Sequence, residues 1–208
     1  MDQRSDEWFQ ARLGRVTASR IADVMAQGRS GKPSATRANY IAELVVERLT
    51  GTPREGFTNA AMQWGTDTEP QARASFTLET GLDVVEVGFC GHPTITMAGA
   101  SPDGLIGEDG LIEIKCPNSA THIATLTGGA IDDKYVKQMQ FQMACTGRKW
   151  CDFVSFDPRM PDEMQLHIQR VQADPAMIQQ IEAAVSELLA EVDETVATLR
   201  ARYMQAAA

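Results

Sequence analysis

Residues 105–115 read LIGEDGLIEIK, two short apolar runs separated by Gly107-Glu108-Asp109-Gly110. An Asp-Gly pair between two such runs is typical of a β-hairpin turn. Pro117 closes the second run, because proline cannot donate the backbone hydrogen bond that a strand requires. The stretch therefore predicts a β-hairpin at the centre of the fold.

Helical patterns precede this hairpin, and further strand and helix patterns follow it. Spacing of apolar residues, capping residues and glycines predicts helices at 5–12, 18–25, 36–49, 60–79 and 132–145. β-branched runs predict further strands at 84–89, 95–100, 150–156 and 163–170. Between Pro117 and the helix at 132, the sequence indicates a polar segment with Gly128-Gly129.

The tail, residues 174–203, predicts one long helix with an apolar stripe. This stripe would pack along the chain's own domain or, alternatively, contact another subunit. The order of elements predicts an α/β fold, in which a central mixed β-sheet is flanked by helices and followed by the long C-terminal helix. We expect a single domain over 1–208, with a helical part at about 5–80, a sheet core at about 82–170 and the helix at about 174–205.

Composition excludes several classes of protein. Apolar residues make up 43% of the 208, and no apolar run approaches the ~20 residues of a membrane span. The N-terminus lacks the features of a secretory signal, so a cytoplasmic protein is expected. The four cysteines form no C-x-x-C pair, which disfavours zinc and iron–sulfur sites. A net charge of −9 argues against DNA binding, unless metal ions or a local basic strip supply positive charge.

Three charged residues in and beside the hairpin suggest chemistry. On a strand, Glu113 and Lys115 point to one face, while Ile112 and Ile114 point to the other. The turn could bring Asp103, which follows Pro102, beside Glu113. Two adjacent carboxylates repel each other, and a divalent cation relieves that repulsion.

Mg²⁺ takes oxygen ligands, so the carbonyl of Ile114 is a further candidate ligand. Lys115 could position an attacking water or take its proton, which is the arrangement for metal-assisted attack on a phosphodiester. The plainer alternative is a cross-strand ion pair without catalytic function.

Five ordered segments extend this pattern across residues 5–156. They are Trp8 and Arg12 with Thr17-Ala18-Ser19, Trp64-Gly65 with Glu69-Pro70, Ser101-Pro102-Asp103-Gly104, Glu113-Ile114-Lys115-Cys116-Pro117, and Tyr135 to Met143. Together they resemble the PD-(D/E)xK nuclease superfamily. Within it, they resemble the phage lambda-type alkaline exonucleases, the YqaJ-like viral recombinase family. The resemblance implies a restriction-endonuclease-like core.

The resemblance also implies an activity and its partners. Family members digest linear double-stranded DNA from 5′ ends, release mononucleotides and leave a 3′ single strand. They use Mg²⁺, with two ions expected and Mn²⁺ as an alternative. They act as homotrimeric rings on DNA and cooperate with a single-strand annealing protein in phage recombination. A ring would also reconcile the net charge of −9 with DNA binding, because basic residues need only line its channel.

Residue roles follow from the matched positions. Asp103, Glu113 and the Ile114 carbonyl are expected to ligate the metals, with Glu69 at the second metal or holding its water. Lys115 is expected to position the attacking water. The remaining implied site residues are Gln138 near the metals with Tyr135 beside it, and Arg12 with Ser19 and Thr17 around the 5′-phosphate.

Plainer roles stand beside these. Arg12 could be a surface cation, Ser19 an N-cap, Glu69 a solvated helix residue, and Gln138 with Gln142 a polar helix face. His122 is expected to be an exposed helix residue. Arg29, Lys32 and Arg37 form a basic cluster in the sequence, which would either track DNA phosphates or form a solvated surface.

Two other functions remain open. One is a structure- or site-specific DNA endonuclease of the same superfamily, which would cut a covalently closed circle. The other is a non-catalytic DNA-end-binding protein, in which the charged residues would have no catalytic role.

Overall fold

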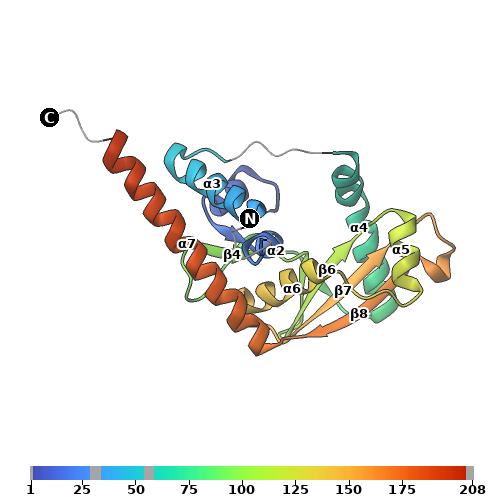
Figure 1. Cartoon of the computed structure of the whole chain (residues 1–208). Coiled ribbons are helices and arrows are strands. Elements are labelled where there is room, and N and C mark those ends of the chain that lie inside the picture. The colour runs from blue at the N-terminus through green and yellow to red at the C-terminus, as the bar shows by residue number, and fades with distance from the viewer. Residues whose placement is uncertain (1, 29–33, 54–58, 205–208) are drawn as a thin grey trace.

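A five-stranded mixed sheet forms the centre of the computed structural model, which describes residues 2–28, 34–53 and 59–204 (Figure 1). Its strands are β2 (Val84–Val85), β5 (Gly104–Ile106), β6 (Gly110–Lys115), β7 (Trp150–Phe156) and β8 (Leu166–Gln172), in the order β2-β5-β6-β7-β8. β6 and β7 are parallel, and the other neighbours are antiparallel. The predicted α/β class with a mixed sheet is therefore confirmed.

The predicted hairpin is β5–β6. Gly104 lies opposite Ile112 and Ile106 lies opposite Gly110, so the next position places Asp103 beside Glu113. Glycine is required at 110, because a Cβ there would lie 2.2 Å from the Trp150 ring of the neighbouring strand. The turn itself needs Gly107, whose φ is +51°.

A second, three-stranded sheet contains β1 (Val16–Thr17), β3 (Cys90–Gly91) and β4 (Ala98–Ala100). The strands predicted at 84–89 and 95–100 were too long. The chain leaves the large sheet after Val85 and enters the small one at Cys90. At this crossing the Phe89 ring packs so closely on Gly99 that a Cβ there would lie 2.2 Å from it. Packing between two sheets, which periodicity does not report, therefore sets the strand ends.

Most predicted helices are present with one-residue differences at their ends. They are α1 (Asp6–Arg12), α3 (Ala35–Thr50), α4 (Ala60–Thr80) and α6 (Asp133–Thr146). Gly51, Gly81 and Gly147 end the last three of these in the left-handed conformation, as expected for C-terminal glycines. The predicted helix at 18–25 is split into the 3₁₀ turn η1 (Ala18–Arg20) and α2 (Ile21–Val24).

One helix was missed, and one histidine was misjudged. Residues Ser119–Leu126 form α5, capped by the Asn118 side chain, where a polar segment was expected. His122 on this helix is fully buried, so its expected exposure was wrong. Its Nδ1 lies 2.8 Å from Oγ of Ser155 and its Nε2 lies 2.8 Å from the Met164 carbonyl oxygen, contacts that sequence spacing does not reveal.

Helices cover both faces of the large sheet (Figure 1). Ala72 and Phe76 of α4 pack on one face with Ile112 and Ile114, as the alternation of β6 predicts. On the other face, Met139 and Met143 of α6 pack on Leu111, Cys151 and Phe153. β6 is therefore covered on both faces, and a charged residue on its α6 side is removed from bulk solvent.

The long C-terminal helix α7 (Pro175–Tyr203) runs along α3 and α2 on its own chain (Figure 1). Its buried stripe contains Ile181, Val185, Leu188, Leu189, Val192 and Val196. Arg37 of α3 pairs with Glu191 of α7 through bonds of 2.6 and 3.0 Å, which ties the two helices together, and its place in a DNA-tracking basic cluster stays a prediction. Within the described ranges, no helix combines the length and apolar character needed to cross a membrane.

Candidate active site

Glu113 lies at the centre of the candidate site and is only 1% exposed. Its Oε1 accepts a 2.7 Å hydrogen bond from Nε2 of Gln138 and lies 2.5 Å from Nζ of Lys115. Its Oε2 accepts a 2.6 Å hydrogen bond from Nε2 of Gln142. Burying a carboxylate is costly unless it is paired and hydrogen-bonded, and here β6 and α6 together supply three donors. The two glutamines thus fix the direction of this carboxylate.

Asp103 lies beside Glu113 through the hairpin register. Its Oδ2 accepts a 2.6 Å hydrogen bond from the backbone N–H of Ile114. Burial raises the pKa of Asp103 well above its usual value, and the negative charges of Glu113 and Glu69 raise it further, against the lowering effect of Lys115. The three carboxylates therefore interact strongly, as expected of acids that share a site.

Lys115 stands between Glu113 and an aromatic ring. Its Nζ lies 4.7 Å from the ring centroid of Tyr135, which stacks on Phe153 at 6.0 Å. Burial alone would lower the pKa of Lys115, but the charges of Glu113 and Asp103 outweigh it and raise that pKa above its ordinary value. Lys115 is therefore an ammonium group in this arrangement, a donor of hydrogen bonds.

Glu69 approaches the site from α4. Its Oε1 binds Arg73 at 2.6 Å, and its Oε2 lies 3.3 Å from Arg4. Glu69 and Asp103 line the same cavity of about 160 Å³. The expected role of Glu69 as a solvated helix residue does not fit this position, since its side chain is only 21% exposed.

The donor atoms of this site suit a hard divalent cation. The site offers carboxylates of Asp103, Glu113 and Glu69, and the carbonyl of Ile114 belongs to the same strand. In the part of the chain that the structure describes, no three acidic, His or Cys side chains are already arranged around one point. Their oxygens point instead to the donors named above. The mutual repulsion that raises the Asp103 pKa is nevertheless what a cation would relieve, so the residues fit the predicted metal.

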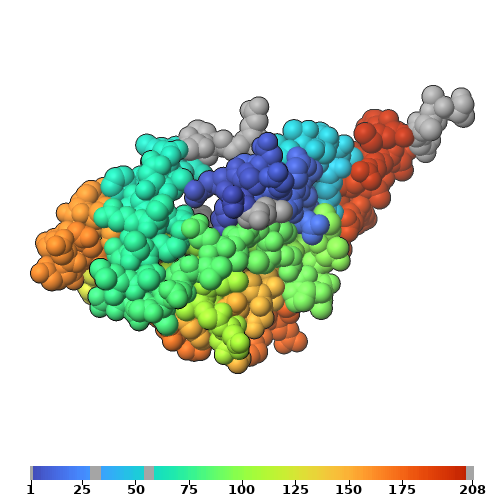
Figure 2. Space-filling view, turned by 180° about the vertical axis from the view of Figure 1, so that it is seen from behind, coloured from blue at the N-terminus to red at the C-terminus, as the bar shows by residue number. Residues whose placement is uncertain are grey.

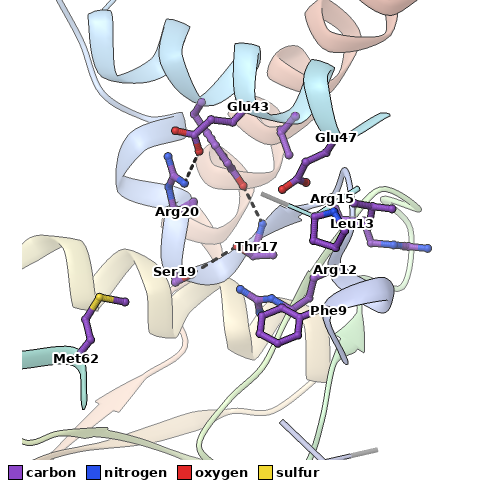
Figure 3. Close-up of a pocket in the computed structure, with 13 residues that line it drawn as sticks. Phe9, Arg12, Leu13, Arg15, Thr17, Ser19, Arg20, Glu43, Glu47 and Met62 are labelled. Atoms are coloured by element: carbon purple, nitrogen blue, oxygen red, sulfur yellow. Dashed lines mark hydrogen bonds and ion pairs between the residues drawn. The ribbon is translucent and has the colours of Figure 1, made fainter. Parts of the chain in front are cut away.

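A second cavity, of about 420 Å³, contains the residues predicted to bind the 5′-phosphate (Figure 3). Arg12 of α1, Thr17 of β1 and Ser19 of η1 line it together, and the hydroxyl oxygens of Thr17 and Ser19 are 3.4 Å apart. Arg12 is half-buried, and burial lowers its pKa. Among the described residues no carboxylate forms an ion pair with it. The negative charge of Glu47, which lines the same cavity, acts against this lowering. Arg12 is thus a half-buried guanidinium that shares its cavity with two hydroxyl groups and a carboxylate.

Ser101 links Arg12 of the second cavity to the segment that carries Asp103. Its hydroxyl accepts hydrogen bonds from Arg12 Nη1 at 3.1 Å and from Trp8 Nε1 at 2.9 Å. Arg12 also lies over the Trp8 ring at 4.1 Å. Because Ser101 precedes Asp103 by two residues, the segment that carries a candidate metal ligand also orients the candidate phosphate ligand.

The predicted site residues thus fall into two groups. The structure brings together Asp103, Glu113, Lys115, Gln138, Tyr135 and Glu69, and separately Arg12, Thr17 and Ser19. Ser19 does not cap the following helix, because the N-cap of α2 is Arg20. Arg29 and Lys32 lie outside the described residues.

Two contributors were missed from the sequence. Gln142 was weighed only as part of a polar helix face, although its spacing of four from Gln138 places both on one side of α6. Ser101 was quoted as part of a motif without a role. The role of its hydroxyl, like that of the Gln142 amide, depends on hydrogen-bond partners that are distant in the sequence.

Comparisons with known proteins agree with this architecture. A crystal structure of an alkaline exonuclease, LHK-Exo, from Laribacter hongkongensis is 55% identical, with 95% of this chain and 97% of that chain covered and a TM-score of 0.88. LHK-Exo in complex with dAMP matches with the same identity and coverage and a TM-score of 0.89.

A phage-related exonuclease from Haemophilus somnus 129PT is 19% identical, covers 89% of this chain and 96% of its own, and has a TM-score of 0.67. At this identity the likeness shows a shared fold. Comparison with curated protein sequences gave no match.

The fold and site define a nuclease of the lambda-exonuclease type, an enzyme that hydrolyses DNA. Residues 7–149 match the model of the YqaJ-like viral recombinase domain. The chain belongs to this family, and the resemblance drawn from the five motifs is confirmed.

Proposed function

We propose that the protein is a Mg²⁺-dependent 5′-to-3′ exonuclease, which degrades one strand of linear double-stranded DNA to mononucleotides and leaves 3′ single-stranded DNA. The observation that carries the proposal is the pairing of an acidic centre with a cavity containing arginine and hydroxyl groups, joined through Ser101. An exonuclease that starts at a 5′-phosphate needs both a hydrolytic centre and a site for that terminal group. The 55% identity to LHK-Exo, and the capture of dAMP by that relative, support a mononucleotide product.

Asp103, Glu113, the Ile114 carbonyl and Glu69 would hold the cation, two Mg²⁺ ions in our proposal, with Mn²⁺ as the alternative. Bound there, Mg²⁺ would promote formation of a hydroxide nucleophile and neutralise charge on the phosphate.

The chain's own residues have separable tasks. Gln138 and Gln142 hold the two oxygens of Glu113, so that its direction does not depend on the ligand. The Lys115 ammonium, positioned by Glu113 and the Tyr135 ring, donates a hydrogen bond that orients the attacking water. Arg12 offers the planar donor pair that suits phosphate oxygens, with Thr17 and Ser19 as hydroxyl donors.

The resemblance supports further features of the proposal. These are a homotrimeric ring around the DNA, a single-strand annealing protein as partner, and action in the cytoplasm of a bacterial host as part of phage recombination. A ring would concentrate basic residues in one channel, which is compatible with a net charge of −9.

The test compares DNA substrates that differ only in their ends. Purified protein with Mg²⁺ is given linear duplex DNA with 5′-phosphate or 5′-hydroxyl ends and a covalently closed circle. We expect rapid release of mononucleotides from the 5′-phosphorylated DNA, slower release from the 5′-hydroxyl DNA, and an intact circle. A strand-specific end label reports the direction of digestion.

Variants assign the activity to the site. Lys115→Ala should abolish digestion, whereas Lys149→Ala, which removes an exposed lysine that pairs with the exposed Asp109, should retain it. Cutting of the circle would favour the endonuclease alternative. Tight binding of DNA ends without any digestion would favour the non-catalytic alternative.

A further inference from the structure

Arg4 occupies a place in the structure that its local contacts do not explain. It is the third residue of a four-residue turn, in which the Ser5 N–H donates to the Asp2 carbonyl at 3.3 Å. Its φ is +69°, and among the described residues it is the only non-glycine residue with a positive φ. Turns with a positive φ at this position usually carry glycine, which has no Cβ, or asparagine, whose short polar side chain tolerates this conformation, whereas a long side chain such as arginine is strained there.

The turn is anchored beside the acidic centre. Nε2 of Gln3 donates to two backbone carbonyls, that of Val87 at 2.9 Å and that of Pro102 at 2.8 Å. Pro102 directly precedes Asp103, so the turn is fixed to the segment that carries this carboxylate. Figure 2 shows the dark-blue N-terminal segment beside α4, drawn in teal, and against the green segment that follows α4. The anchoring places Arg4 at the active site in a defined position.

The observed partner of Arg4 does not account for the strain. A single nitrogen of its guanidinium lies 3.3 Å from Glu69 Oε2, and the Arg4 side chain is 52% exposed. An exposed ion pair with one long contact contributes little to stability. Glu69 also has a shorter bond, of 2.6 Å, to Arg73. The position of Arg4 is therefore not required to neutralise Glu69.

Arg4 has exposed donors to spare in this cavity of about 160 Å³. The other arginine of the cavity, Arg73, is engaged by Glu69 at 2.6 Å and by Glu86 at 2.5 Å, and its one nitrogen without a partner among the described residues, Nε, is buried. Within the described part of the chain, Arg4 has no second hydrogen-bond partner. Its guanidinium thus retains N–H groups at the opening of a cavity lined by Asp103 and Glu69. Strained residues at such positions are a sign of function.

We infer that Arg4 binds a phosphate oxygen of the substrate strand at the acidic centre, and that the strained, Gln3-anchored turn holds it there for this purpose. The ligand is a phosphodiester of DNA, so the inference rests on the proposed function. Arg4 lies before residues 7–149, the part that matches the family model. Its contact is distinct from that of Arg12, which lines the other cavity.

The test uses Arg4→Gly as its central variant, because glycine removes the guanidinium and also the backbone strain. Initial rates on 5′-phosphorylated linear duplex DNA are measured with constant Mg²⁺ over a range of KCl concentrations. Arg4→Asn provides a second uncharged residue suited to positive φ, and Arg4→Lys retains the charge. Arg202→Gly, at an exposed arginine in the last turn of α7, is the matched control.

We expect Arg4→Gly and Arg4→Asn to lower kcat/KM about tenfold at moderate salt, and to reduce the slope of log kcat/KM against log[KCl] by about one, as loss of one phosphate contact does. Arg4→Lys should retain most of the slope, and Arg202→Gly all of it. The thermal midpoint of Arg4→Gly should equal or exceed that of the wild type, so the kinetic loss will not reflect unfolding.

Wild-type KM and wild-type salt slope in Arg4→Gly would overturn the assignment of Arg4 and leave the exonuclease intact. An equal loss in Arg4→Lys and Arg4→Gly without a change in slope would also overturn it. If the wild-type protein itself digests no DNA, the proposed function fails, and the role of Arg4 fails with it.

Discussion

Nε2 of Gln142 donates a 2.6 Å hydrogen bond to Oε2 of Glu113, and both side chains are almost completely buried. A buried amide that donates to a candidate metal ligand controls the direction in which the ligand's free electron pairs point. Gln142 therefore acts on the site through Glu113, as a positioning residue.

Replacement of Gln142 by leucine tests this role. We expect the Mg²⁺ concentration for half-maximal activity to rise about 10- to 100-fold, the usual effect of losing a residue that orients a metal ligand. Isothermal titration with Mg²⁺ measures the same change without turnover.

Gln140 provides the control on the same helix. It is also buried, but it bonds to the backbone of Gln172 and Asp174 at 2.8 Å each. Gln140→Leu should lower the thermal midpoint and leave the Mg²⁺ dependence unchanged. If Gln142→Leu and Gln140→Leu reach half-maximal activity at the same Mg²⁺ concentration, Gln142 contributes only to folding.

Arg12 should determine the preference for a phosphorylated 5′ end. Arg12→Ala removes a half-buried cation that faces Thr17 and Ser19, and should reduce the rate on 5′-phosphorylated DNA about 10- to 100-fold, since hydrogen bonds to charged groups contribute about 1.5–3 kcal/mol. The rate on 5′-hydroxyl DNA should change far less. Competing digestion of the two substrates in one reaction measures the ratio directly.

Arg15→Ala is the matched control for Arg12. Arg15 lines the same cavity (Figure 3), but its guanidinium bonds to the Thr96 carbonyl. Loss of the 5′-phosphate preference in the Arg15 variant, with retention in the Arg12 variant, would reverse the assignment.

The hairpin that aligns Asp103 with Glu113 should be sensitive to added volume at Gly110. A Cβ there would meet the Trp150 ring at 2.2 Å, so Gly110→Ala should lower the free energy of unfolding by about 1–3 kcal/mol through overpacking. Gly65→Ala is the contrast, because a Cβ built there, in the second turn of α4, meets no atom within 4 Å apart from its chain neighbours and the backbone of its own helix. There alanine should stabilise by about 0.5–1 kcal/mol. Urea denaturation measures the free energy of unfolding of both variants. A Gly110→Ala protein as stable as the wild type would contradict the close packing of Gly110 on the Trp150 ring.

Asp157 should contribute stability that depends on pH. Burial alone would raise its pKa, but hydrogen bonds from Arg159 and Ser119 outweigh burial and lower that pKa to about 2. Because the folded pKa lies below the ordinary value of 3.8, the stabilisation is fully present above pH 4 and is lost as pH falls towards 2.

The measurement is urea denaturation of wild type and Asp157→Asn between pH 2 and pH 6. The difference in the free energy of unfolding should be largest near pH 6 and should shrink as the solution is acidified through the interval from about 4 to about 2. A difference that stays constant over this range would mean that the Asp157 charge has no part in stability.

Much of this fold was predictable because its signals are local. The Asp109-Gly110 turn, the Ser5 cap and the glycines that end three helices each act within a few residues. The alternation of side chains along β6 correctly predicted that Glu113 lies on the opposite face of the strand from Ile112 and Ile114. These features need no knowledge of distant parts of the chain.

Other features depend on contacts far along the chain. Helix α5 has a single buried residue, His122, whose partners lie 33 and 42 residues away. The strand predicted at 84–89 is divided because the chain changes sheets there. Gln142, Ser101 and Arg4 escaped prediction for the same reason, since each is defined by a partner from another element.

The hydrogen bond from the Ile114 N–H to Asp103 has a consequence for inactivation. The carboxylate takes the place of a strand partner one position beyond the end of β5, so the same bond belongs to the sheet and to the candidate metal centre. Loosening of this sheet end and misplacement of a ligand are therefore a single event. On heating, the enzyme should lose its activity together with its secondary structure, with no inactive intermediate in which the large sheet is still complete.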